Sequence, residues 1–440
     1  MKLALHWKIV IGMLLGVVVG LALYELREHI ASAAADSPAF ARAGAIADGT
    51  IQFVGQIFLR ALQFIAVPIV FFSLIMGAAS LGDPRKLGKI GLQTVAIYFC
   101  TCVVAVTIGL ALANAIKPGK SVPEKTRVEL MEKYAGAVDK SKADVSGVKK
   151  PIWQTVVDIV PKNPFNALAN ANMLQVVVFG LAIGVALTMI PKHKAAPIVA
   201  IADALTEALA KLVQAALVIA PYAVFALLVP VVATMGYGII QALAMYVLTV
   251  VLGLALVIFV EYGFLIHILA RVSLPRFLKA MAPAQLLAFS SSSSNATLPV
   301  TMQCVKHRLG VSDEITDFVC PLGATINLDG TALYQGVATM FIAQMVGIDL
   351  NLTQQLTIVL TATLATLGTP GIPGAGIVML VIVLQSVGVP AEGIAVILGV
   401  DRLLDMCRTI VNVTGDAVAS VVIARWRGEP ITPRPSASTL

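Results

Sequence analysis

Charged and amide side chains recur at helical spacing in the run DRLLDMCRTIVNVTGD, which spans residues 401–416. At about 100° per residue they fall within roughly a third of a turn. Arg408 offers a planar fork for a carboxylate, and Asp405, one turn earlier, can accept hydrogen bonds from an ammonium group. The pattern predicts a site for a ligand that carries both a carboxylate and an ammonium group. The full stripe comprises Asp401, Asp405, Arg408, Thr409, Asn412 and Asp416.

The helix that carries this stripe lies in a very apolar chain. Residues 394–400 and 417–424 flank it with apolar side chains and give it the length of a membrane span. Of the 440 residues, 58% are hydrophobic and only 12% are charged, which excludes an ordinary soluble globule and indicates a polytopic membrane protein. Charged groups at membrane depth cost about 2.5 to 3.5 kcal/mol each. The stripe is therefore expected to face a bundle interior or a wet cavity.

Basic residues mark one side of the predicted membrane protein. By the positive-inside rule this side, with both termini, is cytoplasmic. The net charge of +7 then reflects topology and gives no support to nucleic-acid binding. Arg402 and the other basic residues near helix ends are expected to take no part in selecting the ligand. The short loops in question contain Lys2, Lys8, Arg85, Lys86, Lys89, Lys192, Lys194, Arg271, Arg276, Lys279, Lys306, Arg308, Arg425 and Arg427.

Two interrupted apolar segments predict re-entrant helical hairpins. In the first, residues 284–289 and 297–305 flank five serines and an asparagine at 290–295. In the second, residues 356–365 and 377–386 flank TLGTPGIPGAG at 366–376. About nine helical residues span only about 14 Å, roughly half of the hydrocarbon core. Each flanking piece is therefore expected to be a half-helix.

A further break is predicted at 323–331, inside the apolar span 318–345. Interrupted segments in corresponding halves of a chain indicate a transporter site at an inverted-repeat interface. The free amides and positive dipole ends of half-helix N-termini, together with serine hydroxyls, suit a carboxylate of the ligand. With Arg408 for a second carboxylate and Asp405 for an ammonium group, the predicted ligand is an acidic amino acid. Asn327, Asp329, Asn412 and Asp416 offer hard oxygens for a small cation such as Na⁺.

Other classes of function explain fewer of these features. An intramembrane serine hydrolase needs a base beside its nucleophile, but all five histidines lie at termini or at the ends of spans, so we predict no enzyme. The five cysteines are odd in number and show no paired C-x-x-C, which indicates neither a disulfide nor a metal. A passive channel shares the need for a polar pathway and remains an alternative. A second alternative is that the Asp and Arg residues of the stripe form salt bridges that merely hold helices together.

Four stretches resemble the signature regions of the glutamate transporter homologue family, the dicarboxylate/amino acid:cation symporters. The likeness extends to residues 66–83 and 163–180 and so covers nearly the whole chain. The four stretches are SSSSNATLP at 291–299, GATINLDGTALYQG at 323–336, GTPGIPGAG at 368–376 and DRLLDMCRTIVNVTGD at 401–416.

The resemblance implies an all-α membrane protein of eight transmembrane helices and two re-entrant hairpins, assembled as a homotrimer in the cell (inner or plasma) membrane. A scaffold of helices 1, 2, 4 and 5 would hold the trimer, while the other elements move as an elevator. The implied division is helices 1–2 at 1–90, helix 3 at 91–116, an external loop at 117–151, helices 4–5 at 152–230, helix 6 at 231–280, hairpin 1 at 281–311, helix 7 at 312–350, hairpin 2 at 351–390, helix 8 at 391–427 and a cytoplasmic tail at 428–440.

The resemblance also implies roles for individual residues. Substrate contacts are expected at Ser293, Ser294, Thr331, Gly371, Asp405, Arg408, Thr409 and Asn412. One sodium site would use Gly323, Asn327, Asn412 and Asp416; a second would use Thr325, Thr366, Leu367 and Thr369; a third would use Tyr98, Thr101, Asn327 and Asp329. No cofactor is implied beyond the coupling ion.

The implied function is symport of glutamate or aspartate with Na⁺. Family members that lack the acidic residue at Asp416 tend to be proton-coupled, and those that lack Asp405 favour dicarboxylates. However, Leu328 stands where sodium-coupled members usually carry Met, and Cys102 where they carry Ser or Thr. Coupling to H⁺, and C4-dicarboxylates as substrates, therefore stay open as alternatives.

Overall fold

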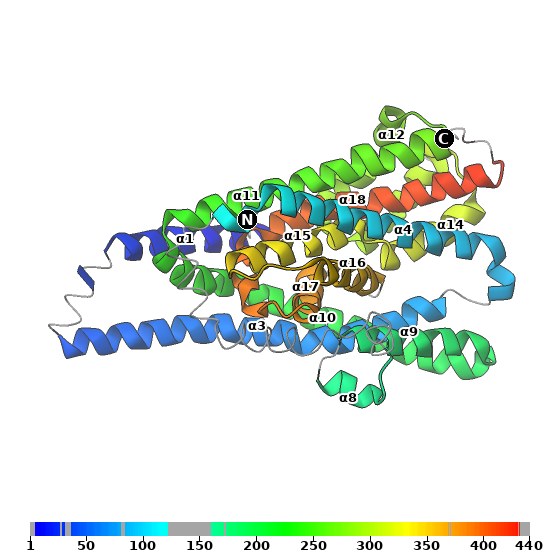
Figure 1. Cartoon of the computed structure of the whole chain (residues 1–440). Helices are drawn as coiled ribbons and strands as arrows, with labels where there is room; N and C mark the ends of the chain where they lie inside the picture. The colour runs from blue at the N-terminus through cyan, green and yellow to red at the C-terminus, as the bar shows by residue number, and fades with distance from the viewer. Residues whose placement is uncertain are drawn as a thin grey trace.

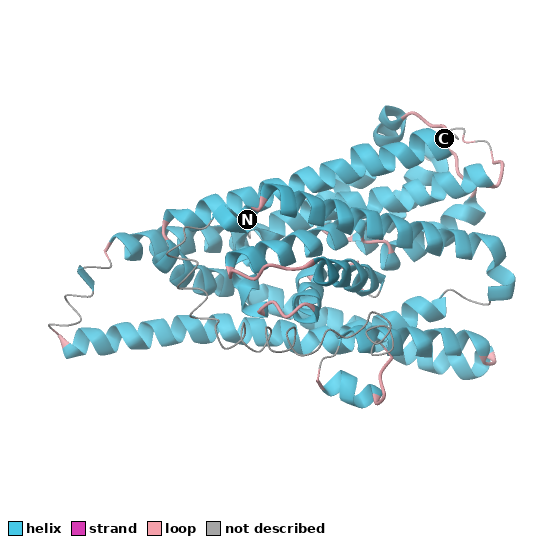
Figure 2. Ribbon diagram, viewed as in Figure 1, coloured by secondary structure: helices cyan, strands magenta, loops and turns pink. Residues whose placement is uncertain are grey.

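The described part of the chain is helical throughout. A computed structural model describes residues 5–26, 29–30, 37–80, 84–121, 160–170, 173–367, 369, 371–429 and 431, and Figure 2 shows helices joined by short loops over these residues, with no strand among them. The predicted all-α class is confirmed for this part. Most of the predicted external loop and cytoplasmic tail, and the extreme N-terminus, lie outside the described residues.

Two groups of helices make up the molecule (Figure 1). In the first, α10 packs on α1 and α3, and α9 packs on α3. The first group contains α1 (Leu5–Glu25), α3 (Pro38–Ser80), α9 (Met173–Met189) and α10 (Lys192–Met235), with the short α8 (Pro164–Ala169) beside α9.

The second group surrounds α18, the helix of the polar stripe. Helices α12, α14 and α15 pack against α18, and α4 packs on α15. The group contains α4 (Pro84–Ile116), η1 (Pro118–Ser121), α11 (Tyr237–Leu256), η2 (Val257–Tyr262), η3 (Leu265–Leu269), α12 (Leu274–Ser291), α13 (Ser294–Gln303), η4 (Cys304–Leu309), α14 (Asp313–Ile326), α15 (Asp329–Met345), α16 (Leu352–Leu367), α17 (Ala375–Ser386), η5 (Ala391–Gly393) and α18 (Ile394–Trp426).

The interrupted segments are longer and more tightly broken than the sequence predicts. Ser290 and Ser291 continue α12, so the turn between α12 and α13 is confined to Ser292 and Ser293. Ser292 adopts a left-handed conformation with φ 53°, which reverses the chain within two residues. The break between α14 and α15 is likewise only two residues, Asn327 and Leu328. Hairpin 1 is consequently built from fuller helices than half-spans of about nine residues.

Few of these helices are plain apolar spans. Among the described residues, Ile90–Ser121 and Tyr237–Leu269 are long and apolar enough to cross a membrane, and α10 adds a third if its two arms, bent by 51°, count as one span. Helix α18 is long enough but carries a charged stripe, and α14 and α15 are separated by their break. The polar features that mark the site thus also interrupt the hydrophobic runs.

Glycines set the packing of α1 on α10. Gly12, Gly16 and Gly20 recur every four residues, so they share one face of α1. A Cβ at Gly12 would overlap the backbone carbonyl of Pro221, and a Cβ at Gly20 would crowd Val232. Small residues at this spacing let two membrane helices approach closely.

We therefore expect Gly12→Ala to destabilise the protein by about 1 to 3 kcal/mol, because a backbone carbonyl cannot move aside as a side chain can. Thermal unfolding of the purified protein in detergent measures this loss. Gly44→Ala is the matched control, since nothing lies within 4 Å of a Cβ there. Equal melting temperatures for the two variants would contradict the packing role of Gly12.

Candidate substrate and cation site

The polar stripe of α18 is buried inside the second group of helices. Asp401, Asp405, Thr409, Asn412 and Asp416 are all buried. Arg408, the sixth member of the stripe, has a relative exposure of 0%. The expectation that the stripe faces an interior is confirmed.

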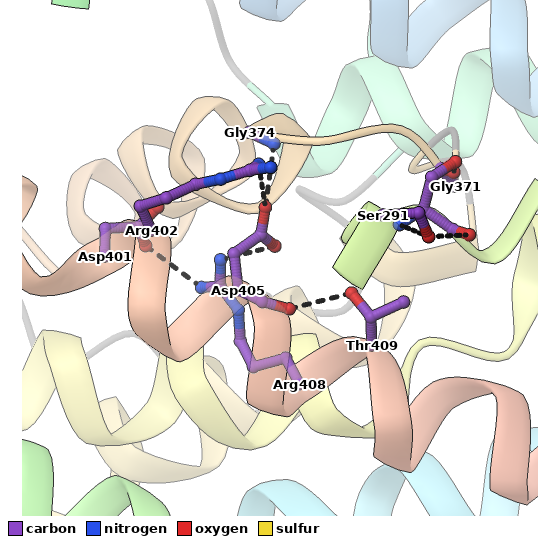
Figure 3. A network of polar contacts seen from close by, with 9 residues as sticks. Ser291, Gly371, Gly374, Asp401, Arg402, Asp405, Arg408 and Thr409 are labelled. Carbon is purple, nitrogen blue, oxygen red and sulfur yellow. Dashed lines mark hydrogen bonds and ion pairs between the residues drawn. The ribbon is translucent and has the colours of Figure 1, made fainter. Parts of the chain in front are cut away.

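Arg408 is held by two carboxylates and an aromatic ring. Its Nη2 lies 2.8 Å from Asp405 Oδ1, and its Nη1 lies 3.2 Å from Asp401 Oδ1. The guanidinium carbon lies 3.7 Å from the ring centroid of Tyr334, which comes from α15. Figure 3 shows Arg408 and Asp405 turned toward each other on α18. The guanidinium group that could bind a ligand carboxylate is thus paired with two carboxylates of the protein itself.

The tips of the two interrupted pairs meet above this cluster. Gly371, in the tip between α16 and α17, accepts a hydrogen bond from Ser293 Oγ at 2.7 Å and one from Asn295 N at 3.2 Å. The amide of Gly374, further along the same tip, donates to Asp405 Oδ2 at 3.1 Å. The tips are therefore bonded both to each other and to the stripe.

A small cavity of about 20 Å³ lies between the tips and α18. This is room for about one water molecule and is too small for an amino acid. The structure brings together most of the predicted substrate residues here. The cavity is lined by Ser292, Ser294, Leu328, Thr331, Thr369, Gly371, Ile372, Ala375, Gly376, Asp405, Thr409 and Asn412.

Two predicted substrate residues lie at the edge of this space. Ser293 caps α13 by accepting from Ala296 N, and it also bonds the opposite tip. Arg408 lies behind the cavity wall, where its terminal nitrogens would be 3.3 Å from a Cβ on Gly376. The glycine at 376 leaves the guanidinium within reach of whatever fills the cavity.

The α14–α15 break places a second polar cluster one turn further along α18. Asn327 Nδ2 donates to Asp416 Oδ1 at 2.9 Å, and Tyr262 of η2 donates to Asp329 Oδ2 at 2.6 Å. Asp329 Oδ1 and Asn327 Oδ1 are buried and have no partner among the described residues. Unpaired oxygens of this kind are costly in an apolar interior and suit a small cation.

Space for such a cation depends on Gly323. A Cβ there would overlap Asp416 Oδ1 and lie 2.5 Å from Tyr98 Oη. Tyr98 in turn donates to Val319 O at 2.9 Å. Gly323, Asn327, Asp416 and Tyr98, predicted to share two cation sites, therefore lie together.

The other residues predicted to bind a cation lie near the tip between α16 and α17. Thr366 bonds the thiol of Cys102 at 3.2 Å, and Thr101 lies beside Cys102 on α4. Thr369 lines both the small cavity and a larger one. Thr325 and Leu367 lie in the last turns of α14 and α16, where helix carbonyls lose their partners.

Several residues of the site were missed by the sequence analysis. Tyr262 contacts Asp329, and Tyr334 contacts Arg408. Both tyrosines come from helices other than α18, and no spacing along the chain links them to it. Glu261 is buried in η2 with both carboxylate oxygens unpartnered among the described residues. The sequence could have indicated this residue, because Glu261 is the one acidic residue in the apolar run 237–269.

If the polar cluster at the α14–α15 break binds a cation, Gly323→Ala should weaken that binding. The added methyl group would fill the space between Asp416 and Tyr98, so we expect the variant to lose the rise in melting temperature that Na⁺ gives the wild type. Gly49→Ala, which meets nothing within 4 Å, serves as the control. An unchanged response of Gly323→Ala to Na⁺ would place the cation elsewhere.

Comparisons with known proteins identify the family of this chain. Residues 5–426 match the model of the sodium:dicarboxylate symporter family. The chain is 35% identical to the proton/sodium-glutamate symport protein of Bacillus subtilis, over 97% of this chain and 94% of that one. It is 34% identical to the proton/glutamate-aspartate symporter of Escherichia coli, over 97% and 93%. It is 35% identical to human excitatory amino acid transporter 3, over 85% and 78%. The chain belongs to the sodium:dicarboxylate symporter family, whose members are membrane transporters and not enzymes.

Proposed function

We propose that this protein is a secondary active symporter that takes up glutamate or aspartate together with Na⁺. The observation that carries the proposal is the buried Asp405–Arg408 pair beneath a cavity closed by two tips. An acidic amino acid can exchange for this pair, since its side-chain carboxylate replaces Asp405 at Arg408 and its ammonium group replaces Arg408 at Asp405. Each buried charge then keeps a partner throughout the exchange.

The remaining ligand groups have complementary partners around the cavity. The main-chain carboxylate is assigned to Ser294 and the amides at the start of α13, with Asn412 opposite. The hydroxyl of Thr409, which donates to Asp405 O at 2.7 Å, presents its oxygen to the ammonium group. Thr331 and Gly371 complete the walls.

Sodium is assigned to the polar cluster around the α14–α15 break. Asp329 and Asp416 are buried, and among the described residues neither forms an ion pair with lysine or arginine. A cation that arrives with the substrate supplies the missing charge. Na⁺ fits a set of carboxylate, amide and released carbonyl oxygens. Proton coupling is the second candidate, because the relatives from Bacillus subtilis and Escherichia coli carry the proton in their names.

For the movement, we infer an elevator in which the second group of helices travels along the first. The second group holds the whole site, while packing between the groups is sparser than within them. An open cavity of about 560 Å³ separates α10 from α14 and reaches Thr369 and Ile372 in the second tip. It supplies a route to the small cavity once that tip moves. The proposal also includes eight membrane spans, assembly as a homotrimer, location in the inner membrane and both termini on the cytoplasmic side.

Uptake by purified protein in liposomes tests the proposed symport. Because Asp329 and Asp416 need a cation, we expect labelled aspartate or glutamate to accumulate above its external concentration only with an inward Na⁺ gradient. Equal accumulation with a proton gradient alone would assign the coupling to H⁺. Equilibration without accumulation under both gradients would identify a passive channel.

Arg408→Ala tests the proposed substrate. Loss of a buried charge partner costs about 2 to 5 kcal/mol, so aspartate should bind about 30-fold to several thousand-fold more weakly. Serine and alanine bring no second carboxylate and should lose much less. Competition against labelled aspartate measures both effects. Arg408→Lys, which keeps the charge but not the fork, should fall between the wild type and Arg408→Ala. Equal losses for acidic and neutral ligands would leave Arg408 with a structural role only.

A further inference from the structure

Arg402 lies against the substrate site and not at a free helix end. Its side chain runs along α18 so that Nη1 is 3.7 Å from Asp405 Oδ2, and only 16% of the side chain is exposed. Figure 3 shows the guanidinium of Arg402 beside Gly374, next to the carboxylate of Asp405. The expectation that Arg402 takes no part in the site therefore needs revision.

The two oxygens of Asp405 face different partners. Oδ1 accepts from Arg408 Nη2 at 2.8 Å. Oδ2 accepts from the amide of Gly374 at 3.1 Å and faces Arg402. When Arg408 turns to a ligand carboxylate, Oδ1 becomes free for an ammonium group. Oδ2 still keeps its amide and its second arginine.

The charges of the four ionised residues in this cluster also cancel. Asp401 and Asp405 carry two negative charges, and Arg402 and Arg408 carry two positive ones. The cluster is therefore neutral before any ligand enters. Without Arg402 it would carry a net charge of −1 in a region of low dielectric, and it would repel an anionic ligand.

We propose that Arg402 is a specificity-determining residue that holds Asp405 and balances its charge, so that the site accepts ligands of net negative charge. The proposal rests on the proposed function, in which Arg408 exchanges its carboxylate partner for the ligand. Among the described residues, Arg402 forms its ion pair with Asp405 and does not line the small cavity, so it acts through Asp405.

Arg402→Gln tests this role, since it removes the charge and keeps an amide of moderate length. A unit charge at about 10 Å in an effective dielectric of about 20 changes affinity by about tenfold for each charge on the ligand. We therefore expect aspartate, with net charge −1, to bind about tenfold more weakly, and malate, with net charge −2, to lose about a hundredfold. Asparagine, which differs from aspartate by one charge at nearly equal size, should be almost unaffected. Competition against labelled aspartate, with the full-length protein in Na⁺, gives the three ratios.

Two further variants separate charge from fold. Arg402→Lys keeps the charge and should retain most of the wild-type selectivity. Arg425→Gln removes an exposed arginine from the last turn of the same helix and should change nothing. Equal losses for all three ligands, or failure of lysine to restore the order, would overturn the proposal and leave Arg402 a purely structural residue. So would a gain in aspartate affinity in Arg402→Gln, since it would mean that Arg402 competes with the ammonium group. If the wild type itself binds no acidic amino acid, the proposed function fails instead.

Discussion

The cost of removing a guanidinium from water governs this structure. Arg408 is fully buried, and an isolated ion in such a place would cost several kcal/mol even after relaxation. Its surroundings offset that cost with Asp401, Asp405 and the face of Tyr334. The Asp405 carboxylate needs partners in turn, which explains why the Gly374 amide and Arg402 converge on its second oxygen. The tips, the stripe and α15 are assembled around one requirement.

The same requirement links the substrate region to the cation region. Asn412 Oδ1 accepts from Gly330 N at 2.9 Å, and its Nδ2 lies 3.4 Å from Thr331 Oγ1, so it ties α18 to the first turn of α15. Asp416 lies one turn further along α18 and is bonded to Asn327 at the start of the break. A cation that draws Asn327 and Asp416 together therefore acts on the backbone that lines the ligand cavity. In the proposed symport, coupling between the two regions needs no long pathway, because they share one helix and one break.

The residues on α18 could be predicted because helical periodicity determines which side chains share a face. The tips could be predicted because glycine, proline and serine runs cannot continue an apolar helix. Tyr262, Tyr334 and Glu261 were not predicted, since their proximity to α18 depends on the packing of separate helices. Arg402 was misjudged because it lies just outside the arc of the stripe, and only its long side chain brings it back to Asp405. The reach of a flexible side chain is not encoded in spacing.

The contact between the tips depends on a single acceptor. Among the described residues, the two hydrogen bonds that join them both end on the carbonyl oxygen of Gly371. Rotation of one peptide plane would release both together, at a net cost of about 1 to 3 kcal/mol. The two tips are therefore joined at one peptide group, and any change in the orientation of the Gly371 carbonyl breaks both of these contacts together.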